Sequence, residues 1–296
     1  MSLDELLGRC TFAPAGSALV CAVSGGADSL ALLVLACATG APVTAVHVDH
    51  GLRPESAGEA EVVAAAARRF GAAFRTEKAT VGAGANLEAR ARAARRAVLG
   101  PDAATGHTMD DQAETVLLNL LRGSGLDGLA GMRPGPGHPL LGLRRAETRA
   151  LCAALDLDPV CDGSNSDPRF RRNRVRHELL PMCSDVAGRD VVPLLARQAG
   201  LLAAEGDLLD ELAAGIDPSD GAALASAPGP LARRATRRWL RRGGPHPPDL
   251  AAVERVLRVA RGDARATDVA PGVRVRRSHG RLSVAPVVPP GHGPGR

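Results

Sequence analysis

The first 122 residues alternate between short apolar runs and longer helical patterns. The predicted strands are Leu19–Val23, Val43–Val48, Ala72–Thr76 and Asp102–Gly106, and the predicted helices are Leu30–Ala38, Ala57–Phe70, Asn86–Leu99 and Met109–Arg122. Strands alternating with helices predict βαβ units and a doubly wound, mostly parallel sheet, as in a Rossmann-like α/β domain. Because ligands of such sheets bind beyond the carboxyl ends of the strands, the residues after each strand are candidates for function.

The second half of the sequence is organised differently. Glycine and proline fill Gly123–Pro139, which is typical of an active-site loop or a linker. The elements predicted after it are a helix at Glu147–Leu157, a polar stretch at Asp162–Arg176, helices at Val191–Ala214, Leu231–Arg242 and Asp249–Ala260, and a hairpin at Val273–Val284. We expect a catalytic domain at residues 1–185, a smaller mainly helical domain at 190–286 and a disordered tail at 287–296.

Positive charge is concentrated in that second half. Residues 161–296 carry 22 basic and 15 acidic side chains, whereas residues 1–160 carry 15 and 17. A basic half beside a nearly neutral one suggests that the second domain contacts a polyanion. Only 2% of the residues are aromatic, which argues against RNA binding through rows of stacked rings.

The six cysteines form no C-x-x-C pair, and no histidine cluster accompanies them at zinc-like spacing. We expect reduced thiols that serve mostly as small apolar core residues. The N-terminus lacks the pattern of a signal peptide, and the apolar run Leu30–Ala38 is about half as long as a membrane helix. The sequence therefore predicts a soluble cytoplasmic protein with no membrane partner.

The first strand leads directly into Ser24-Gly25-Gly26-Ala27-Asp28-Ser29. The glycines allow backbone N–H groups close to phosphate, the serines add hydroxyl donors, and the following helix adds positive potential. The loop contains no lysine and matches neither Walker A nor G-x-G-x-x-G. It is similar to the SGGxDS loop of ATP pyrophosphatases, so we expect residues 24–29 to bind ATP. Asp28 is the candidate ligand for Mg²⁺ on the phosphates and a candidate catalytic residue.

His47 and Asp49 stand at the end of the second predicted strand, beside the first strand in a doubly wound sheet. A polar residue at a strand end is usually a satisfied cap, so this signal is weak by itself. Next to an SGGxDS loop, the strand end is well placed for adenine and ribose. We therefore expect His47 and Asp49 to bind the nucleotide.

The fourth predicted strand is followed by the run HTMDDQAET, residues 107–115. Asp111 and Glu114 share a helix face, and Arg122 continues near it. Helix capping explains Asp110, but it does not explain His107 and Glu114 beside a nucleotide loop. We expect His107, Asp111, Glu114 and Arg122 to be catalytic.

Five segments together resemble bacterial tRNA(Ile)-lysidine synthases. They are SGGADSLALL, VHVDHGLRPES, NLEARARAARR, ATGHTMDDQAETVLLNLLRGSGLDGLAGM and DGSNSDPRFRRNRVRHELLP. The resemblance covers residues 18–181 and, loosely, the C-terminal hairpin. The chain departs from the family at Arg95-Arg96, where the family often has Arg-Tyr. It also departs at His138-Pro139-Leu140-Leu141, where the family often has Arg-Pro-Leu-Leu.

The resemblance implies a reaction with ATP, free L-lysine and an isoleucine tRNA that has a CAU anticodon. ATP adenylates O2 of the wobble cytidine 34, and the lysine amino group then displaces AMP at C2 to give lysidine. Lysine's ammonium needs carboxylates, and its attacking amine needs a nearby base. Asp111, Glu114 and His107 are all candidates for that base. A homodimer is one assembly that we consider.

We expect tRNA contacts from Arg90 and from two clusters of arginines. The first cluster lies in the family-like segment and comprises Arg169, Arg171, Arg172, Asn173, Arg174 and Arg176, and the second forms a stripe on one helix, Arg233, Arg237 and Arg241. Contacts to phosphate would provide affinity without reading sequence. A solvated arginine face is the alternative for the second cluster.

Three other functions are compatible with the first motif. A tRNA thiolation enzyme shares the loop type, but its chemistry usually employs paired cysteines. An amide-forming ligase that acts on a small metabolite leaves the basic second half unexplained. A non-enzymatic adenine-nucleotide sensor would not need His107, Asp111 and Glu114, and it would release no pyrophosphate.

Overall fold

The computed structural model describes residues 2–49, 56–79, 90, 94, 97–160, 167–241 and 248–286. The chain divides into two compact units, Met1–Ala203 and Ala204–Arg296. The division lies within the long helix α10 (Val192–Ala214), downstream of the boundary expected near residues 185–190.

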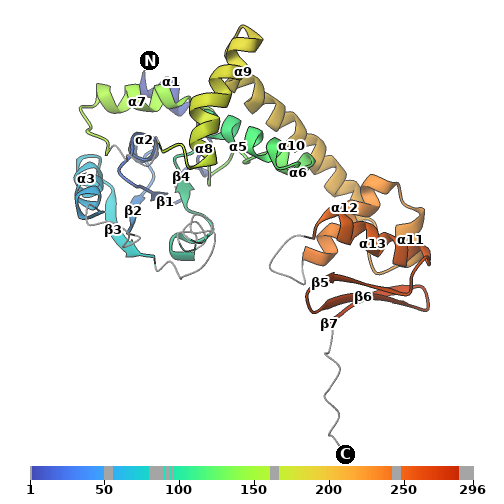
Figure 1. Cartoon of the computed structure of the whole chain (residues 1–296). Coiled ribbons are helices and arrows are strands. Elements are labelled where there is room, and N and C mark those ends of the chain that lie inside the picture. Colours follow the sequence, from blue (N-terminus) through green and yellow to red (C-terminus); the bar gives the residue numbers. More distant parts are fainter. Residues whose placement is uncertain are drawn as a thin grey trace, which may run out of the picture. The chain divides into compact units, whose positions relative to one another are not determined.

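Unit 1 is built on a parallel sheet with the strand order β3-β2-β1-β4 (Figure 1). The strands are β1 (Leu19–Ala22), β2 (Val43–Asp49), β3 (Ala73–Lys78) and β4 (Ala104–Thr105). Leu19 pairs with Val43 on one side of β1, and Cys21 pairs with Ala104 on the other. All these pairs are parallel, which confirms the predicted α/β class. The residues that follow β1, β2 and β4 therefore meet at one edge of the sheet.

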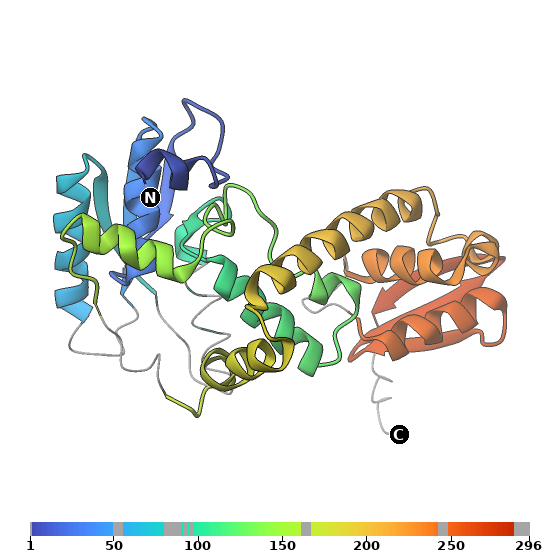
Figure 2. The same ribbon diagram turned by 90° about the horizontal axis from the view of Figure 1, so that it is seen from above.

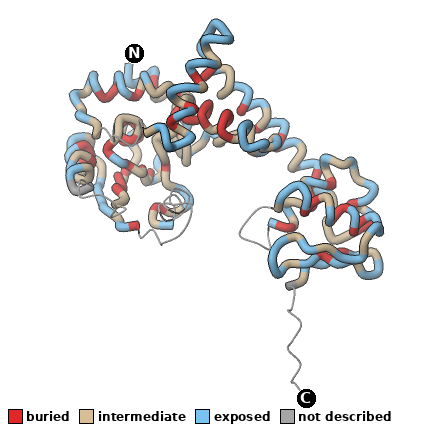
Figure 3. Tube along the Cα trace, in the orientation of Figure 1, coloured by how far each residue is buried: buried red, intermediate tan, exposed pale blue. Residues whose placement is uncertain are grey.

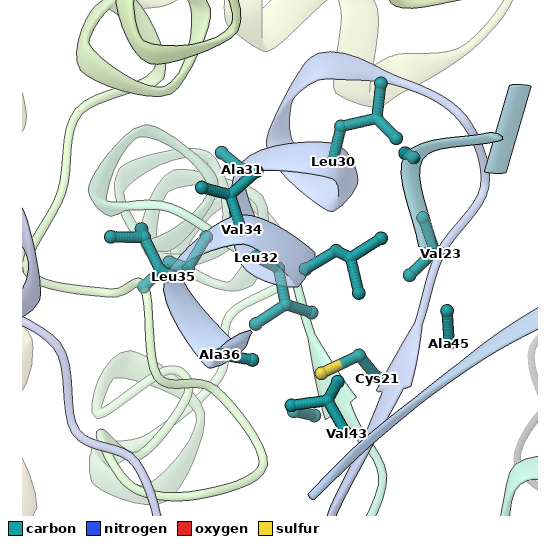
Figure 4. Packing of buried hydrophobic residues seen from close by; sticks show 14 of the residues in the cluster. Cys21, Val23, Leu30, Ala31, Leu32, Val34, Leu35, Ala36, Val43 and Ala45 are labelled. Carbon is teal, nitrogen blue, oxygen red and sulfur yellow. The ribbon is translucent and has the colours of Figure 1, made fainter. Parts of the chain in front are cut away.

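The central helix of unit 1 is α2 (Ala27–Ala38), whose residues Ser29–Ala36 are all buried. It packs against β1 and β2 and against three helices, α1 (Leu3–Leu7), α3 (Ser56–Arg69) and α7 (Arg145–Ala154). Figure 4 shows its leucines beside Cys21 and Val43 of the sheet. Each fully buried leucine contributes about 1.5–3 kcal/mol. The phosphate-type loop at the start of α2 is therefore attached to a well-packed core.

A second cluster of helices surrounds α5 (Met109–Leu121) (Figure 2). It contains α6 (Leu126–Leu129), α8 (Arg171–Arg174), the π-helical turn η2 (Val175–Leu179) and α9 (Leu180–Ala187). Buried residues run along both α2 and α5 (Figure 3). The polar stretch expected at Asp162–Arg176 is helical from Arg171 onward, because Val175 and Leu180 pack against Leu117 and Leu118 of α5. The helix predicted at Asn86–Leu99 falls largely outside the described residues.

Unit 2 packs helices against a three-stranded antiparallel sheet. The helices are α11 (Gly221–Ser226), α12 (Gly229–Arg241) and α13 (Leu250–Arg261), and the strands are β5 (Ala266–Ala270), β6 (Val273–Ser278) and β7 (Arg281–Pro286). The predicted hairpin is present as β6 and β7. The third strand, β5, was not predicted. It is short and largely exposed, and its pairing with β6 has a register irregularity between Asp268 and Ala270. The core joins Val253, Val256 and Leu257 of α13 to Val275 and Leu282.

Within the described ranges, no helix is long and apolar enough to cross a membrane.

Candidate active site

The Ser24–Ser29 loop joins β1 to α2 and is ordered by its own serines. The backbone N–H of Ser24 donates to Oγ of Ser29 at 3.1 Å, and that hydroxyl donates to the Gly26 carbonyl at 2.8 Å. Gly25 has a φ of +88°, which favours glycine, and its carbonyl accepts from the N–H of Val160. The first N–H groups of a helix have no partner within it. The loop therefore presents donors at the N-terminus of α2, where an anion is favoured.

Gly106 is a point of close approach between β4 and this loop. A Cβ at Gly106 would lie 2.7 Å from the carbonyl oxygen of Asp28 and 3.0 Å from the nitrogen of Ser29. Both of these are backbone atoms, so they cannot move aside as a flexible side chain would. Only glycine fits here, and His107 is the next residue along the chain.

His47 lies inside the sheet edge rather than on an open surface. Its Nδ1 is 3.1 Å from the Val23 carbonyl, and its side chain is buried. Nε2 is buried with no hydrogen-bond partner among the described residues. His47 therefore links the ends of β1 and β2. Asp49 is half-buried at the last position of β2, and residues 50–55 lie outside the described part.

The first turn of α5 is closed by a capping box. Asp111 accepts from the backbone N–H and the hydroxyl of Thr108, both at 2.9 Å. The capping role thus belongs to Asp111, and the expectation that capping explains Asp110 is wrong. Asp110 instead accepts from the N–H of Arg145 and from the guanidinium of Arg144.

Arg145 connects the phosphate-type loop to the acidic face of α5. Its guanidinium is 3.5 Å from Asp28, 2.9 Å from Asp111 and 3.1 Å from Glu114. Thr148, one turn further along α7, donates a hydrogen bond to Asp28. Arg145 lies outside every motif in the sequence, so no motif predicted its role. One indication of its position is present in the sequence: Arg145 lies just before Glu147, with which the predicted helix begins.

Two arginines expected on the tRNA side also contact the acidic face. Nε of Arg172 is 2.7 Å from Glu114, and Nε of Arg176 is 2.7 Å from the same carboxylate. Glu114 has no exposed side-chain surface. Three carboxylates, Asp28, Asp111 and Glu114, therefore meet three guanidiniums, those of Arg145, Arg172 and Arg176. The formal charges of this cluster, here called the charge-balanced cluster, cancel.

The cluster shifts two carboxyl groups in opposite directions. Burial raises the pKa of Asp28, and its hydrogen bond from Thr148 and the charge of Arg145 only partly offset this. Burial also acts to raise the pKa of Asp111, but the charges of Arg145 and Arg172 and the N–H of Thr108 outweigh it. The pKa of Asp111 is lowered to about 2. Asp111 is therefore a weak base at neutral pH.

His107 is half-buried at the end of β4, immediately before the N-cap of α5. A positive charge on this ring would be close enough to Asp111 to lower the pKa of that carboxyl group. Its Nδ1 lies 2.8 Å from the hydroxyl of Thr105. The structure thus brings His107, Asp111, Glu114 and Asp28 into one neighbourhood at the carboxyl edge of the sheet.

Gln112 anchors the Gly- and Pro-rich loop. Its side-chain amide donates to the Met132 carbonyl at 2.9 Å and accepts from the Met132 N–H at 2.8 Å. Gly131 has a φ of +60°, and a Cβ there would meet the Gln112 amide at 2.7 Å. Gln112 is therefore a structural residue that holds the loop against α5.

Arg122 is not part of the charge-balanced cluster. It caps the far end of α5, eight residues or about 12 Å of helix beyond Glu114. There it borders a cavity of about 490 Å³ together with Arg171, Arg174 and apolar side chains, Leu118, Leu121, Val175, Leu179 and Met182. We call this the arginine-rimmed groove. Arg122 and Arg171 have no ion pair within the described part of unit 1, whereas Arg174 pairs with Glu178 at 2.9 Å.

The other residues expected to contact tRNA divide into exposed and interior groups. Arg169 is exposed and pairs with Asp167. Asn173 is buried and donates to the Asp167 carbonyl, so it orders the start of α8. Arg90 is half-buried, and its Nε and Nη1 have no partner among the described residues.

The arginines of α12 form two faces with different surroundings. On one face, Nε of Arg234 is 2.6 Å from the carboxylate of Asp210 in α10. Arg238, on the same face, donates to the backbone carbonyl of Asp210 at 2.8 Å. On the other face, Arg233 pairs with Glu254 at 2.5 Å. Arg237 and Arg241 have no ion pair within the described part of unit 2. These two side chains are therefore the best candidates of the helix for phosphate contacts.

Five cysteines lie in described parts of the chain, and all five are free thiols. Burial raises the pKa of Cys21 to about 12 and that of Cys152 to about 11. Because the thiolate is the reactive and metal-binding form, these two residues are poorly suited to persulfide or cluster chemistry.

Comparisons with known proteins match two parts of the chain to known families. Residues 2–183 match the PP-loop domain family, and residues 220–283 match the TilS substrate binding domain. A tRNA(Ile)-lysidine synthase from Nocardia farcinica is 43% identical, over 91% of this chain and 92% of its own length. One from Mycolicibacterium paratuberculosis is 48% identical over 75% and 74%. The solved U34-tRNA thiolase from Methanococcus maripaludis has a TM-score of 0.52 at 17% identity, covering 68% of this chain and 77% of its own, which supports the fold alone.

Proposed function

This chain belongs to the tRNA(Ile)-lysidine synthase family, and we propose that its reaction takes place where the Ser24–Ser29 loop meets the first turn of α5. As a member of that family it is an ATP-using enzyme that forms lysidine at the wobble cytidine of an isoleucine tRNA. The observation that carries the proposal is Arg145, whose single guanidinium contacts Asp28, Asp111 and Glu114. A nucleotide loop and an amino-acid pocket would thus share one residue.

The first half-reaction forms a bond between O2 of cytidine and the α-phosphorus of ATP, and pyrophosphate leaves. The donors of the Ser24–Ser29 loop suit the departing pyrophosphate, since they hold an anion without a lysine. We assign adenine and ribose to the ends of β1 and β2, near Asp49. Asp28 fits Mg²⁺ because its carboxylate is half-buried and the contacts from Thr148 and Arg145 only partly offset the effect of burial. With ATP, Mg²⁺ would neutralise phosphate charge, and one or two protein carboxylates suffice to hold it.

The second half-reaction forms a C2–N bond with the amine of lysine and breaks the C2–O bond to AMP. Free lysine carries an α-carboxylate and an α-ammonium, and the charge-balanced cluster offers partners for both. Arginines 145, 172 and 176 suit the carboxylate, and Asp111 and Glu114 suit the ammonium. Lysine would exchange with existing ion pairs, so binding would leave the net charge of the cluster unchanged.

The attacking amine must lose a proton, and His107 is our choice of base. Asp111 has a pKa of about 2, so it accepts a proton poorly at neutral pH. Both oxygens of Glu114 already accept hydrogen bonds from arginines. An imidazole titrates near the working pH, which suits proton transfer.

For tRNA, we propose contacts at the arginine-rimmed groove and at Arg237 and Arg241. Apolar side chains with unpaired guanidiniums at the rim suit a nucleotide, whose base is apolar on its faces and whose phosphate is anionic. Arg90 and Arg169 stay weaker candidates. A cytoplasmic location and a homodimer stay predictions from sequence.

The decisive experiment is mass spectrometry of nucleosides from an isoleucine tRNA transcript incubated with the full chain, Mg-ATP and lysine. We expect lysidine only when all three are present, and ATP–pyrophosphate exchange with tRNA when lysine is omitted. For the lysine site, Asp111→Asn should raise the KM for lysine much more than the KM for ATP, whereas Asp185→Asn on the exposed part of α9 serves as the matched control. Equal changes in both KM values would remove Asp111 from the lysine pocket. Thiolated cytidine or uridine would instead favour the thiolation alternative.

A further inference from the structure

The hydroxyl of Thr105 contacts two histidine rings at once. Its Oγ1 lies 2.8 Å from Nδ1 of His107 and 2.8 Å from Nδ1 of His138. It also donates to the Gly137 carbonyl at 2.9 Å. The two rings meet edge to face, with centroids 5.1 Å apart and an angle of 80° between their planes. Thr105 is the last residue of β4, and His138 belongs to the loop after α6.

Counting hydrogen bonds favours one position for the hydrogen on each ring. A hydroxyl has one proton to donate and two lone pairs that accept. The Thr105 proton goes to Gly137, so both lone pairs face the histidines. Each Nδ1 must then be a donor that carries its own hydrogen. In the neutral imidazole the other nitrogen, Nε2, consequently holds a lone pair.

The alternative arrangement is less favourable. Turning the hydroxyl toward one Nδ1 would keep a bond to each ring, because the other Nδ1–H could still donate to the hydroxyl oxygen. It would lose the hydroxyl bond to the Gly137 carbonyl, whose other partner is the backbone N–H of Thr105 at 3.0 Å. In the favoured arrangement the hydroxyl donates its proton to Gly137 and accepts one hydrogen bond from each histidine. The half-buried position of the three side chains limits replacement of these bonds by water.

We propose that Thr105, with His138 as its second partner, is a positioning residue that fixes His107 in the tautomer with hydrogen on Nδ1. This inference rests on the proposed function, in which His107 takes a proton from the lysine amine. A neutral imidazole accepts a proton at Nε2 only in the tautomer that carries its hydrogen on Nδ1. The family often has arginine where this chain has His138. The second histidine partner of Thr105 is therefore a feature of this chain.

The test uses full-length protein labelled with ¹⁵N-histidine, with His107 assigned by the loss of its signals in His107→Gln. In the wild type we expect Nδ1 of neutral His107 at the shift of a protonated nitrogen and Nε2 at that of an unprotonated one. Thr105→Val, which keeps the shape and removes the hydroxyl, should move a large fraction of His107 to the opposite tautomer. Thr105→Ser restores the hydroxyl and should restore the wild-type tautomer. An unchanged tautomer in Thr105→Val would overturn the proposal.

His138→Phe is a second variant that keeps a ring in place and removes one donor. Because the Thr105 hydroxyl then has a free lone pair and can turn, both His107 tautomers should appear. Only the wild-type tautomer in this variant would overturn the part assigned to His138.

Kinetics separate this inference from the proposed function. In Thr105→Val, single-turnover transfer of lysine to preformed adenylated tRNA should fall about tenfold or more, whereas ATP–pyrophosphate exchange stays near the wild-type rate. If the tautomer changes and lysine transfer does not, Thr105 still positions the ring, and the assignment of His107 as the base fails.

Discussion

Arg176 and Glu114 form a two-point ion pair in unit 1, with Nε 2.7 Å from Oε1 and Nη2 3.1 Å from Oε2. Arg145 and Arg172 contact the same carboxylate, which has no exposed surface. Such a pair is weak evidence for stability by itself, because desolvation offsets the attraction. Removing one partner is different, since the remaining buried charges lose their compensation.

We therefore expect Glu114→Gln to lower the free energy of unfolding by about 3–5 kcal/mol. The matched control is Glu178→Gln in η2. It breaks the exposed ion pair between Glu178 and Arg174 and should have little effect on the free energy of unfolding. Urea unfolding monitored by circular dichroism measures both. Equal small effects in the two variants would mean that the three arginines are adequately solvated without Glu114.

The stability of unit 1 should depend on Asp111 at acid pH. Its pKa in the folded chain is about 2, below the ordinary value of about 4 for an unfolded chain. The unfolded chain therefore binds more protons between these values, and the stabilisation by this group is present above about pH 4 and lost as the pH falls toward 2. Its size is on the order of 2 kcal/mol. Urea unfolding of the ligand-free chain at pH 6 and at pH 3 should show a smaller loss in Asp111→Asn than in the wild type. An identical loss would contradict this assignment.

Asp28→Asn should abolish ATP–pyrophosphate exchange while the fold persists. The amide keeps the size of the side chain but removes the charge that we assign to Mg-ATP. The acidic residue Asp127 lies on the exposed side of α6, so Asp127→Asn is the control and should retain exchange. Exchange at the wild-type rate in Asp28→Asn would place the metal and the phosphates elsewhere.

Arg237→Gln combined with Arg241→Gln should weaken tRNA binding and reduce its dependence on salt. Each lost phosphate contact lowers the log–log salt slope by roughly 0.7–0.9, so two contacts should lower it by about 1.4–1.8. ATP binding should be unaffected. Arg274→Gln is the control in unit 2, because Arg274 pairs with Asp268 at 2.6 Å on the exposed sheet. A wild-type slope in the double variant would favour a solvated arginine face, and the arginine-rimmed groove would become the main tRNA contact.

The sequence was most informative where local rules and tertiary packing agree. The Ser24–Ser29 loop lies at the end of a strand, as its glycines and the following apolar helix indicate. His107 and Glu114 come close to Asp28 because parallel strands put their carboxyl ends at one edge. The helices α8, η2 and α9 were harder to predict from the sequence. Val175, Leu180 and Cys183 belong to one apolar cluster, but the arginines between residues 169 and 176 obscured the helical period.

The partners of the arginines could not be read from the sequence. Arg172 and Arg174 are two residues apart, yet Arg172 contacts buried Glu114 and Arg174 contacts exposed Glu178. Their difference depends on the direction in which α8 and η2 present each side chain. Arg145 was missed for the same reason, since its role comes from the packing of α7 against α2 and from no local motif.

Gly106 makes one further property of the molecule predictable. Gly106, the residue before His107, lies against the backbone of Asp28 and Ser29 at the start of α2, so there is no room for even one methyl group at this position. In a mutational scan of the whole chain selected for lysidine formation, every substitution at Gly106 should be depleted, alanine included. In such a scan Gly106 would be as intolerant of substitution as a catalytic residue, although glycine has no side chain that could take part in the chemistry.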